Sequence, residues 1–130
     1  MKRKTIKIEI NIMHSIKSLY DELYNLRGEK IMSECYLYVM GHYATKMIYI
    51  GITNDLKKRV EDHKNNLIAG FSSEYKVDLL IYYERFSNVS DAVEKEQLYQ
   101  KWKNRGWLLT MIAKKNPLWN DLYNEILIFT

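Results

Sequence analysis

An arginine and a histidine stand four positions apart, at Arg59 and His63, and both residue types suit phosphate chemistry. On a helix this spacing places the two side chains on one face, a turn apart. A guanidinium is always charged and presents forked donors to phosphate oxygens, while a histidine can accept or pass a proton near neutral pH. The alternative is a core histidine, because His63 also continues an apolar stripe formed by Leu56, Val60 and Leu67.

A lone carboxylate, Glu96, falls on the apolar face of a predicted helix. At about 100° per residue, Glu96 lies between Val89 and Ala92, whereas Glu94 points to the opposite, solvent side. Burial of a carboxylate is costly unless a metal ion, a cation or a hydrogen-bond network compensates it. An internal salt bridge, for example with Arg59, and a metal site both remain open as explanations.

Two tyrosines, Tyr38 and Tyr49, fall on short apolar runs that are typical of the two strands of a hairpin. Aromatic residues favour strands in any case, so their position alone is a weak signal. A phenol has a pKa of about 10 and acts as a base only where cations depress that value. Gly51, two residues after Tyr49, would let a backbone or a phosphate approach closely.

Residues 97–116 contain no acidic residue, and their five basic residues are interleaved with Trp102 and Trp107. The basic residues are Lys101, Lys103, Arg105, Lys114 and Lys115. Basic and aromatic residues together suit a phosphate backbone and a base-stacking platform. Core tryptophans beside a solvated lysine face fit the same pattern equally well.

The elements that must position these residues alternate after residue 34. Strands are expected at residues 36–40, 47–53 and 79–86, with a turn at 41–45. A helix should begin at the cap residues Thr53-Asn54-Asp55 and close near Gly70, and another should run from caps near Asn88 to about Lys103. Gly106 interrupts the second helix, and further helical segments are expected at 107–115 and from Pro117 to about 126.

This order, β-β-α-β-α-α, predicts an α/β domain of the α+β type, with a small three-stranded mixed or antiparallel sheet flanked by helices. It should occupy residues 32–130. Ahead of it, residues 1–12 alternate in polarity like a strand, and residues 15–26 carry apolar residues at helical spacing. Residues 1–31 are therefore expected to form a strand-helix extension that packs on the domain or forms a homodimer surface.

Size and composition limit the possible classes of protein. A chain of 130 residues suits one domain, and its net charge of +4 favours polyanionic partners such as nucleic acid. The single cysteine, Cys35, excludes an intramolecular disulfide and a cysteine-rich zinc site. No apolar run is long enough to span a membrane, so a soluble, cytoplasmic protein is expected.

Taken together, the pieces resemble the GIY-YIG nucleases, and most of all the small stand-alone, single-domain bacterial branch of that superfamily. The resemblance covers roughly residues 34–126. It is carried by Tyr36-Leu37-Tyr38, by the stretch from Tyr49 to Arg59, by His63 and Glu96, and by Asn116-Pro117-Leu118-Trp119-Asn120-Asp121-Leu122. The chain departs from the family at Tyr36-Leu37, where Gly-Ile is usual, and at Gln100, where a lysine is expected.

The resemblance implies a role for each matching residue. Tyr38 or Tyr49, helped by His63, would deprotonate or orient the attacking water, and Arg59 would steady the phosphate charge. Glu96 would bind a single Mg²⁺ or Mn²⁺ ion that stabilises the leaving oxygen. Further substrate contacts are expected from Gly51, Lys57, Lys58, Lys101, Lys103 and Arg105.

The expected function is therefore a metal-dependent DNA endonuclease that is structure-selective and acts in repair or recombination, with RNA left open as a substrate. Two alternatives belong to other classes. One is a nucleic-acid-binding module that has the fold but cleaves weakly or not at all. The other is an interaction protein that assembles through residues 1–31.

Overall fold

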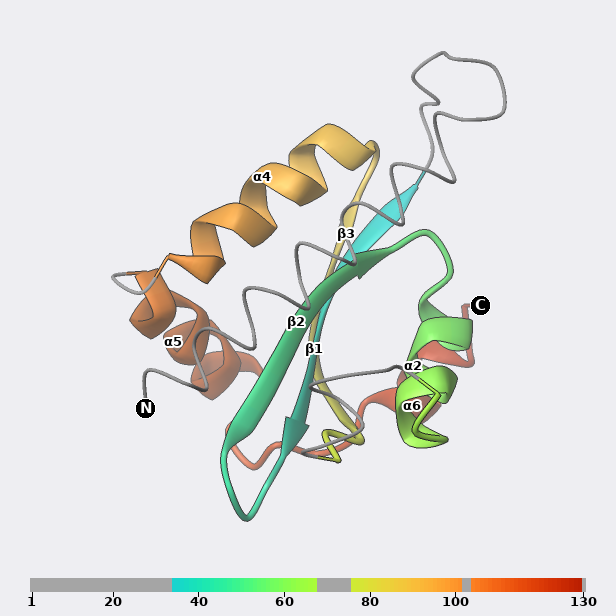
Figure 1. Ribbon diagram of the computed structural model, residues 1–130, viewed down its shortest axis with the longest axis vertical. Coiled ribbons are helices and arrows are strands. Elements are labelled where there is room, and N and C mark those ends of the chain that lie inside the picture. Colours follow the sequence, from blue (N-terminus) through green and yellow to red (C-terminus); the bar gives the residue numbers. More distant parts are fainter. Residues whose placement is uncertain (1–33, 68–75, 102–103, 130) are drawn as a thin grey trace.

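The chain is described by a computed structural model over residues 34–67, 76–101 and 104–129 (Figure 1). The expected N-terminal strand, helix and dimer surface at 1–31 lie outside these residues, as do Trp102 and Lys103. The elements follow the order β1 (Cys35–His42), β2 (Met47–Thr53), α2 (Leu56–Lys64), β3 (Leu79–Phe86), α4 (Val89–Gln100), α5 (Arg105–Lys115) and α6 (Tyr123–Ile126).

The sheet is antiparallel throughout, with the strand order β2-β1-β3. The antiparallel form of the prediction is thus confirmed, and β2 and β3 have the predicted bounds. In the central strand, Tyr38 pairs with Gly51 on one side and with Tyr83 on the other. This register places the tyrosine of β1 directly beside the glycine of β2.

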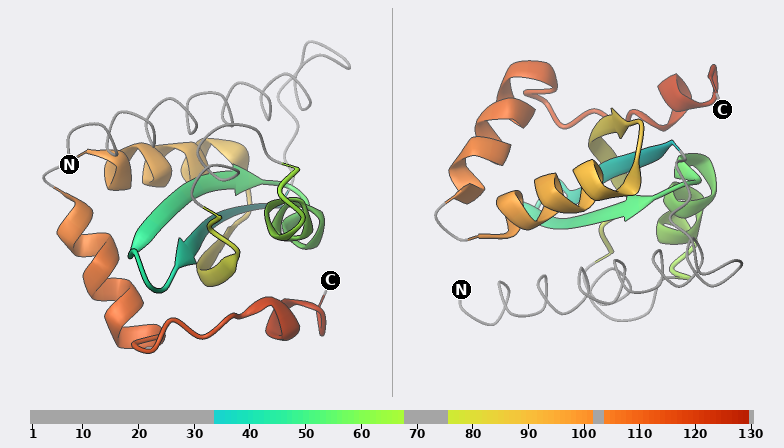
Figure 2. Two further views of the ribbon diagram at one scale, coloured as in Figure 1. Left: turned by 60° about the horizontal axis from the view of Figure 1, so that its bottom comes forward. Right: turned by 90° about the horizontal axis from the view of Figure 1, so that it is seen from above.

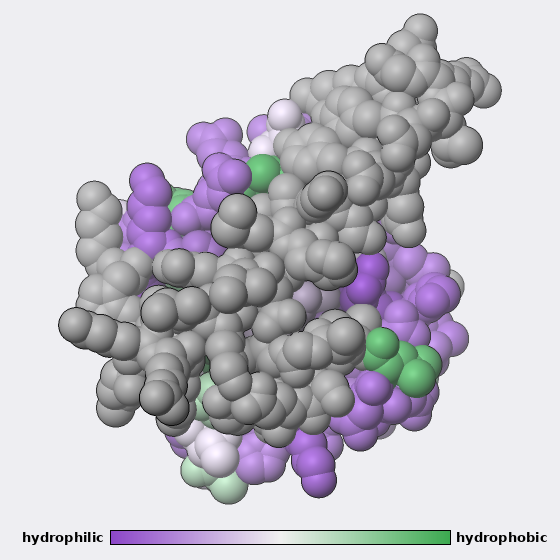
Figure 3. All heavy atoms as spheres, viewed as in Figure 1, coloured by the Kyte–Doolittle hydropathy of each residue, from purple (hydrophilic) through white to green (hydrophobic). Residues whose placement is uncertain are grey.

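Helices lie on both sides of the sheet. Figure 1 shows α4 and α5 on one side and α2 and α6 on the other, and both views in Figure 2 keep this arrangement. The buried core is built mainly from the strands, which supply residues such as Leu37, Val39 and Ile50, and it continues into Val60 of α2 and Leu108 of α5. Hydrophilic residues predominate on the described surface visible in Figure 3.

Helix α2 begins where its cap residues predict, but it ends early. The Asp55 carboxylate accepts a hydrogen bond from the Lys58 backbone N–H at 3.2 Å, as expected of an N-cap. The helix stops at Lys64, not near Gly70, because the chain turns at Asn65 and Asn66 adopts a φ of 57°. Asparagine tolerates this left-handed conformation better than most residues.

The break between α4 and α5 also falls elsewhere than predicted. Helix α4 is capped by the Asn88 side chain, which accepts from the Asp91 N–H, and ends at Gln100 because Lys101 is extended. Gly106 does not interrupt a helix. It lies in the first turn of α5, which begins at Arg105.

The prediction of a helix from Pro117 is wrong. The Asn116 amide donates to the carbonyl groups of Ile81 and Asn120 at 3.0 and 2.8 Å, and its Oδ1 accepts from the Asn120 N–H at 2.9 Å. These local bonds compete with helix formation, and Trp119 adopts a φ of 54°. Only the short α6 forms, after Leu122.

The segment between α5 and α6 lies along β3 and reaches α2. Asp121 accepts hydrogen bonds from the N–H groups of Leu80 and Tyr123, each at 3.1 Å, and its other oxygen pairs with Lys64 of α2. Leu122 donates its N–H to the Leu80 carbonyl at 2.8 Å. The stretch that supported the family resemblance near the C-terminus thus links β3, α2 and α6. In the described parts of the chain, no helix is long and apolar enough to cross a membrane.

Candidate active site

Tyr38, Tyr49 and His63 form a buried aromatic cluster between the sheet and α2. The Tyr38 hydroxyl lies 3.0 Å from His63 Nε2, within hydrogen-bond distance. The rings of Tyr49 and His63 are 4.7 Å apart at their centroids, and those of Tyr38 and Tyr49 are 6.1 Å apart. All three side chains are almost fully enclosed. Residues from two strands and a helix are thus brought into one contact group.

Gly51 makes room for Tyr38. A Cβ atom at Gly51 would lie 2.6 Å from Tyr38 Oη and 2.8 Å from its ring carbon Cζ, distances that real contacts do not reach. The phenol ring therefore crosses β2 over the missing side chain. This gives Gly51 a structural reason to be glycine, while its expected contact with a phosphate stays a prediction.

The tyrosine–histidine pair rests in its neutral form. Burial, reinforced by the nearby charge of Arg59, lowers the pKa of His63 to about 3. Burial and the neighbouring Tyr49 raise the pKa of Tyr38 well above its ordinary value, and Arg59 opposes this only in part. His63 is therefore an uncharged imidazole and Tyr38 a protonated phenol near neutral pH.

Arg59 lies on α2, one turn before His63, and is half-buried. Its charge is felt by both Tyr38 and His63. Within the described residues, its guanidinium has no ion pair and no hydrogen bond with another side chain. A half-buried guanidinium without an acidic partner is suited to an anion from outside the chain.

Glu96 is fully buried on α4, with 0% of its surface exposed, which confirms the position expected from the helical wheel. Neither carboxylate oxygen has a hydrogen-bond partner in the described part of the chain, so the alternative of an internal salt bridge, for example with Arg59, finds no support there. Burial raises the pKa of Glu96 well above its ordinary value. Burial raises the pKa of Cys35 to about 11, and the charge of Glu96 adds a smaller contribution to this rise and to that of Tyr38.

These properties of Glu96 fit one hard divalent cation. A positive charge beside the carboxylate would stabilise it, because its two buried oxygens have no hydrogen-bond partner among the described residues. No cluster of three or more His, Cys, Asp or Glu side chains suited to a metal occurs among the described residues. A single carboxylate suits Mg²⁺ or Mn²⁺, ions that keep most of their water.

Two of the lysines expected to bind substrate pair with acidic neighbours on their own helix. Lys57 and Lys58 form ion pairs with Glu61 and Asp62 along α2, at 3.0 and 3.5 Å. Lys101 is exposed just after α4, whereas Arg105 is half-buried. Their contacts with a substrate stay predictions.

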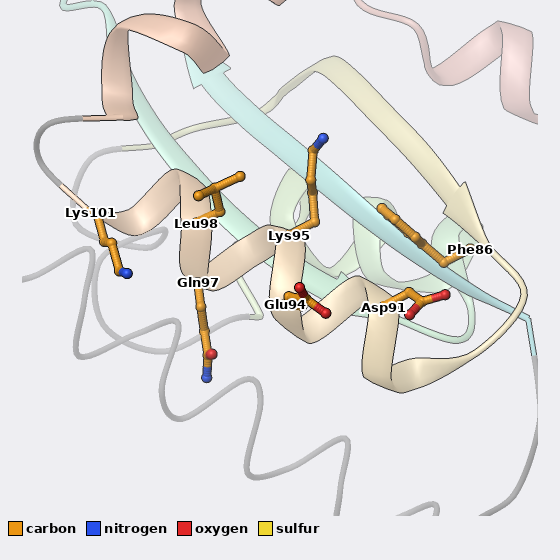
Figure 4. Close-up of a pocket in the computed structure, with 7 residues that line it drawn as sticks. All are labelled: Phe86, Asp91, Glu94, Lys95, Gln97, Leu98 and Lys101. Atoms are coloured by element: carbon orange, nitrogen blue, oxygen red, sulfur yellow. The ribbon is translucent and has the colours of Figure 1, made fainter.

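Trp107 and a surface cavity lie away from this cluster. Trp107 is 59% exposed on α5, so the alternative of a core tryptophan does not hold for it. A surface cavity of about 550 Å³ lies along the outer side of α4, lined by Phe86, Asp91, Glu94, Lys95, Gln97, Leu98 and Lys101 (Figure 4). It carries both signs of charge and does not include Glu96.

The sequence left two features of the site unrecognised. The direct bond between Tyr38 and His63 joins residues 25 positions apart, and spacing along one helix cannot reveal it. Gln100 was treated only as a departure from the family, although its side-chain oxygen and nitrogen are buried near the end of α4. Its position four residues after Glu96 indicates that the two side chains share one face of the helix.

Comparison with known proteins places this geometry in a family. The GIY-YIG catalytic domain family matches residues 34–110, and the chain belongs to it. A UPF0213 protein of Streptococcus pyogenes serotype M5 is 37% identical over 81 residues, which is 62% of this chain and 86% of that protein. A UPF0213 protein of serotype M1 is 36% identical over the same span. No solved structure matches significantly.

Proposed function

We propose that the chain is a metal-dependent endonuclease that hydrolyses phosphodiester bonds in DNA. The observation that carries the proposal is the hydrogen bond between Tyr38 and His63, at a point where the charges of Arg59 and Glu96 both act on Tyr38. The Glu96 carboxylate has no hydrogen-bond partner among the described residues. Membership of the GIY-YIG catalytic domain family supports the same chemistry.

Tyr38 is the tyrosine that handles the proton of the attacking water in this proposal. In this mechanism its hydroxyl donates to Nε2 of the neutral His63 ring, and its oxygen accepts from the attacking water. As hydroxide attacks phosphorus, Tyr38 accepts the water proton and passes its own to Nε2. Because His63 is neutral at rest, it can accept that proton without losing one first.

Arg59 and Glu96 would stabilise the charges that develop during the reaction. The guanidinium of Arg59 donates to non-bridging phosphate oxygens, where negative charge grows in the transition state. Glu96 holds the Mg²⁺ or Mn²⁺ ion, which when bound supplies positive charge that stabilises the leaving oxygen. That ion also favours the ionised form of Glu96, which burial alone disfavours.

The proposed substrate class rests on the charge of the chain. The net charge of +4 favours the phosphate backbone, and contacts to phosphates carry no sequence information. We therefore propose cleavage directed by DNA structure, in repair or recombination. Lys101 and Arg105 are the proposed backbone contacts nearest to the end of α4.

The test is cleavage of plasmid, single-stranded, flap and branched DNA with Mg²⁺ or Mn²⁺, with matching RNA strands alongside. Wild type is compared with Glu96→Gln and with Glu94→Gln, which removes an exposed carboxylate from the same helix. We expect products that require metal, vanish in Glu96→Gln and persist in Glu94→Gln. DNA binding without products would instead support a binding module, and equal products from all three proteins would contradict the proposed site.

A further inference from the structure

Four side-chain atoms on α4 are buried without a hydrogen-bond partner among the described residues. Two are the carboxylate oxygens of Glu96, and two are Oε1 and Nε2 of Gln100. Buried polar atoms in folded proteins nearly always have partners. A group of four unpaired atoms on one helix therefore points to a ligand that supplies them.

Gln100 lies on the same face of α4 as Glu96. The two residues are four positions apart, so their side chains leave the helix one turn from each other. The opposite, outer side of the helix is different, because Glu94 and Gln97 line the surface cavity there (Figure 4). The unpaired amide thus belongs to the inner side of α4, with the carboxylate.

A side-chain amide is suited to both kinds of group that a metal-bound phosphodiester would bring. Its oxygen accepts hydrogen bonds, and its nitrogen donates them. A hard cation held by one carboxylate carries several water molecules, and these donate. A phosphate oxygen accepts. The lysine that family members are expected to carry at this position could only donate.

We propose that Gln100 is a positioning residue of the Glu96 metal site, with its Oε1 accepting a hydrogen bond from a metal-carried water and its Nε2 donating to a phosphate oxygen. This inference rests on the proposed function, since it takes Glu96 as the metal ligand. Gln100 does not touch the metal itself. It acts by holding the hydrated ion and the DNA strand in a fixed position relative to each other.

The test measures Mn²⁺ binding to the full chain without DNA, from the electron paramagnetic resonance signal of free Mn²⁺. Gln100→Leu should raise the Mn²⁺ Kd by about tenfold, the usual effect of losing an outer partner of a metal site. The same substitution should raise the thermal midpoint of the metal-free protein, because it removes two buried polar atoms that lack partners. Gln97→Leu, an equal change on the exposed side of α4, should alter neither quantity.

Two results would overturn the inference. An unchanged Mn²⁺ Kd in Gln100→Leu would remove Gln100 from the metal site. A lower thermal midpoint in the metal-free variant, together with an unchanged Mn²⁺ Kd in Gln100→Ala, would show that the amide is already satisfied within the protein. Gln100→Ala is measured in parallel and judged by the Kd alone, so that a packing defect of leucine cannot decide the outcome.

Glu96→Gln separates this inference from the proposed function. If Glu96→Gln weakens Mn²⁺ binding and Gln100→Leu does not, the inference fails and the metal site stands. If Glu96→Gln leaves Mn²⁺ binding unchanged, the metal placement fails, and the role of Gln100 fails with it.

Discussion

At the scale of single residues, the contact between Tyr38 and His63 joins two groups whose charged forms are both disfavoured. The pair is better suited to orienting a water molecule and to passing a proton late in a reaction than to holding a permanently ionised side chain. A hydroxyl and an imidazole can pass one proton along their hydrogen bond only when charge develops at the reacting phosphate. In the proposed mechanism, each of the two residues therefore depends on the presence of the other.

Tyr38→Phe should lower kcat by about 100-fold or more, the usual size of a general acid–base contribution. The phenylalanine ring fills the space over Gly51 but cannot carry the proton. The measurement is steady-state cleavage by Tyr38→Phe, Tyr49→Phe and the control Tyr43→Phe, whose side chain is 55% exposed at the hairpin turn. Full activity in Tyr38→Phe would remove this hydroxyl from the mechanism.

His63 should make the protein less stable as the pH falls. Its pKa is 6.5 when unfolded and about 3 when folded, so the unfolded chain binds the extra proton between these values. The stability contributed by neutral His63 is fully present above pH 6.5 and is lost toward pH 3, with a slope of about 1.4 kcal/mol per pH unit.

Urea unfolding at pH 5 to 8 tests this contribution, because carboxyl groups titrate mostly below that range. His63→Gln should flatten the loss of unfolding free energy below pH 6.5. His42→Gln, at the less buried end of β1, should keep the wild-type slope. Equal slopes in all three proteins would show that His63 is not held neutral.

At the scale of elements, the strand pair β1–β2 depends on the close approach of the Tyr38 ring to Gly51. Gly51→Ala places a Cβ atom where the Tyr38 ring lies, and overpacking of this kind costs about 1–3 kcal/mol. The ring must shift, so both the free energy of unfolding and the cleavage rate should fall. The stability loss is measured by chemical denaturation.

Two comparisons isolate that clash. Gly106→Ala lies in a helix, and its new Cβ meets no atom within 4 Å, so it should be neutral or stabilising by about 0.5–1 kcal/mol. In a Tyr38→Ala background, Gly51→Ala should cost little, since the clashing ring is gone. A cost that persists in that background would contradict the assigned role of Gly51.

At the scale of the whole molecule, Asp121 joins parts of the chain that are distant in sequence. It contacts β3, the start of α6 and Lys64 of α2. Helix α2 also carries Arg59 and His63. Its substitution should therefore affect both the stability of the domain and the placement of α2. This role was not foreseen, because a helix was predicted for residues 117–126.

Asp121→Ala should lower the free energy of unfolding by about 1–3 kcal/mol, because two backbone N–H groups lose their acceptor. Asp121→Asn keeps an acceptor for those groups and should recover part of the loss. The control is Asp62→Ala, which removes a surface ion pair along α2 worth at most about 1 kcal/mol. Equal losses for Asp121→Ala and Asp62→Ala would contradict the linking role.

Local patterns determined much of the fold. Runs of branched and aromatic residues predicted all three strands, because alternation and β propensity act over a few neighbours. Asp55 and Asn88 predicted two helix starts, because an N-cap bond spans three residues. The burial of Glu96 also followed from the sequence alone, since the helical period fixes which side chains share a face.

Tertiary structure decided what depends on residues far apart in the chain. The bond from Tyr38 to His63, the need for glycine at position 51 and the links made by Asp121 all join separate elements. Asn116 overrode the helical pattern after Pro117 through bonds to β3 and to its own turn. The sequence named the chemical groups of the site, but only packing could show which of them meet and which lack a partner, because contact and burial are properties of the folded chain.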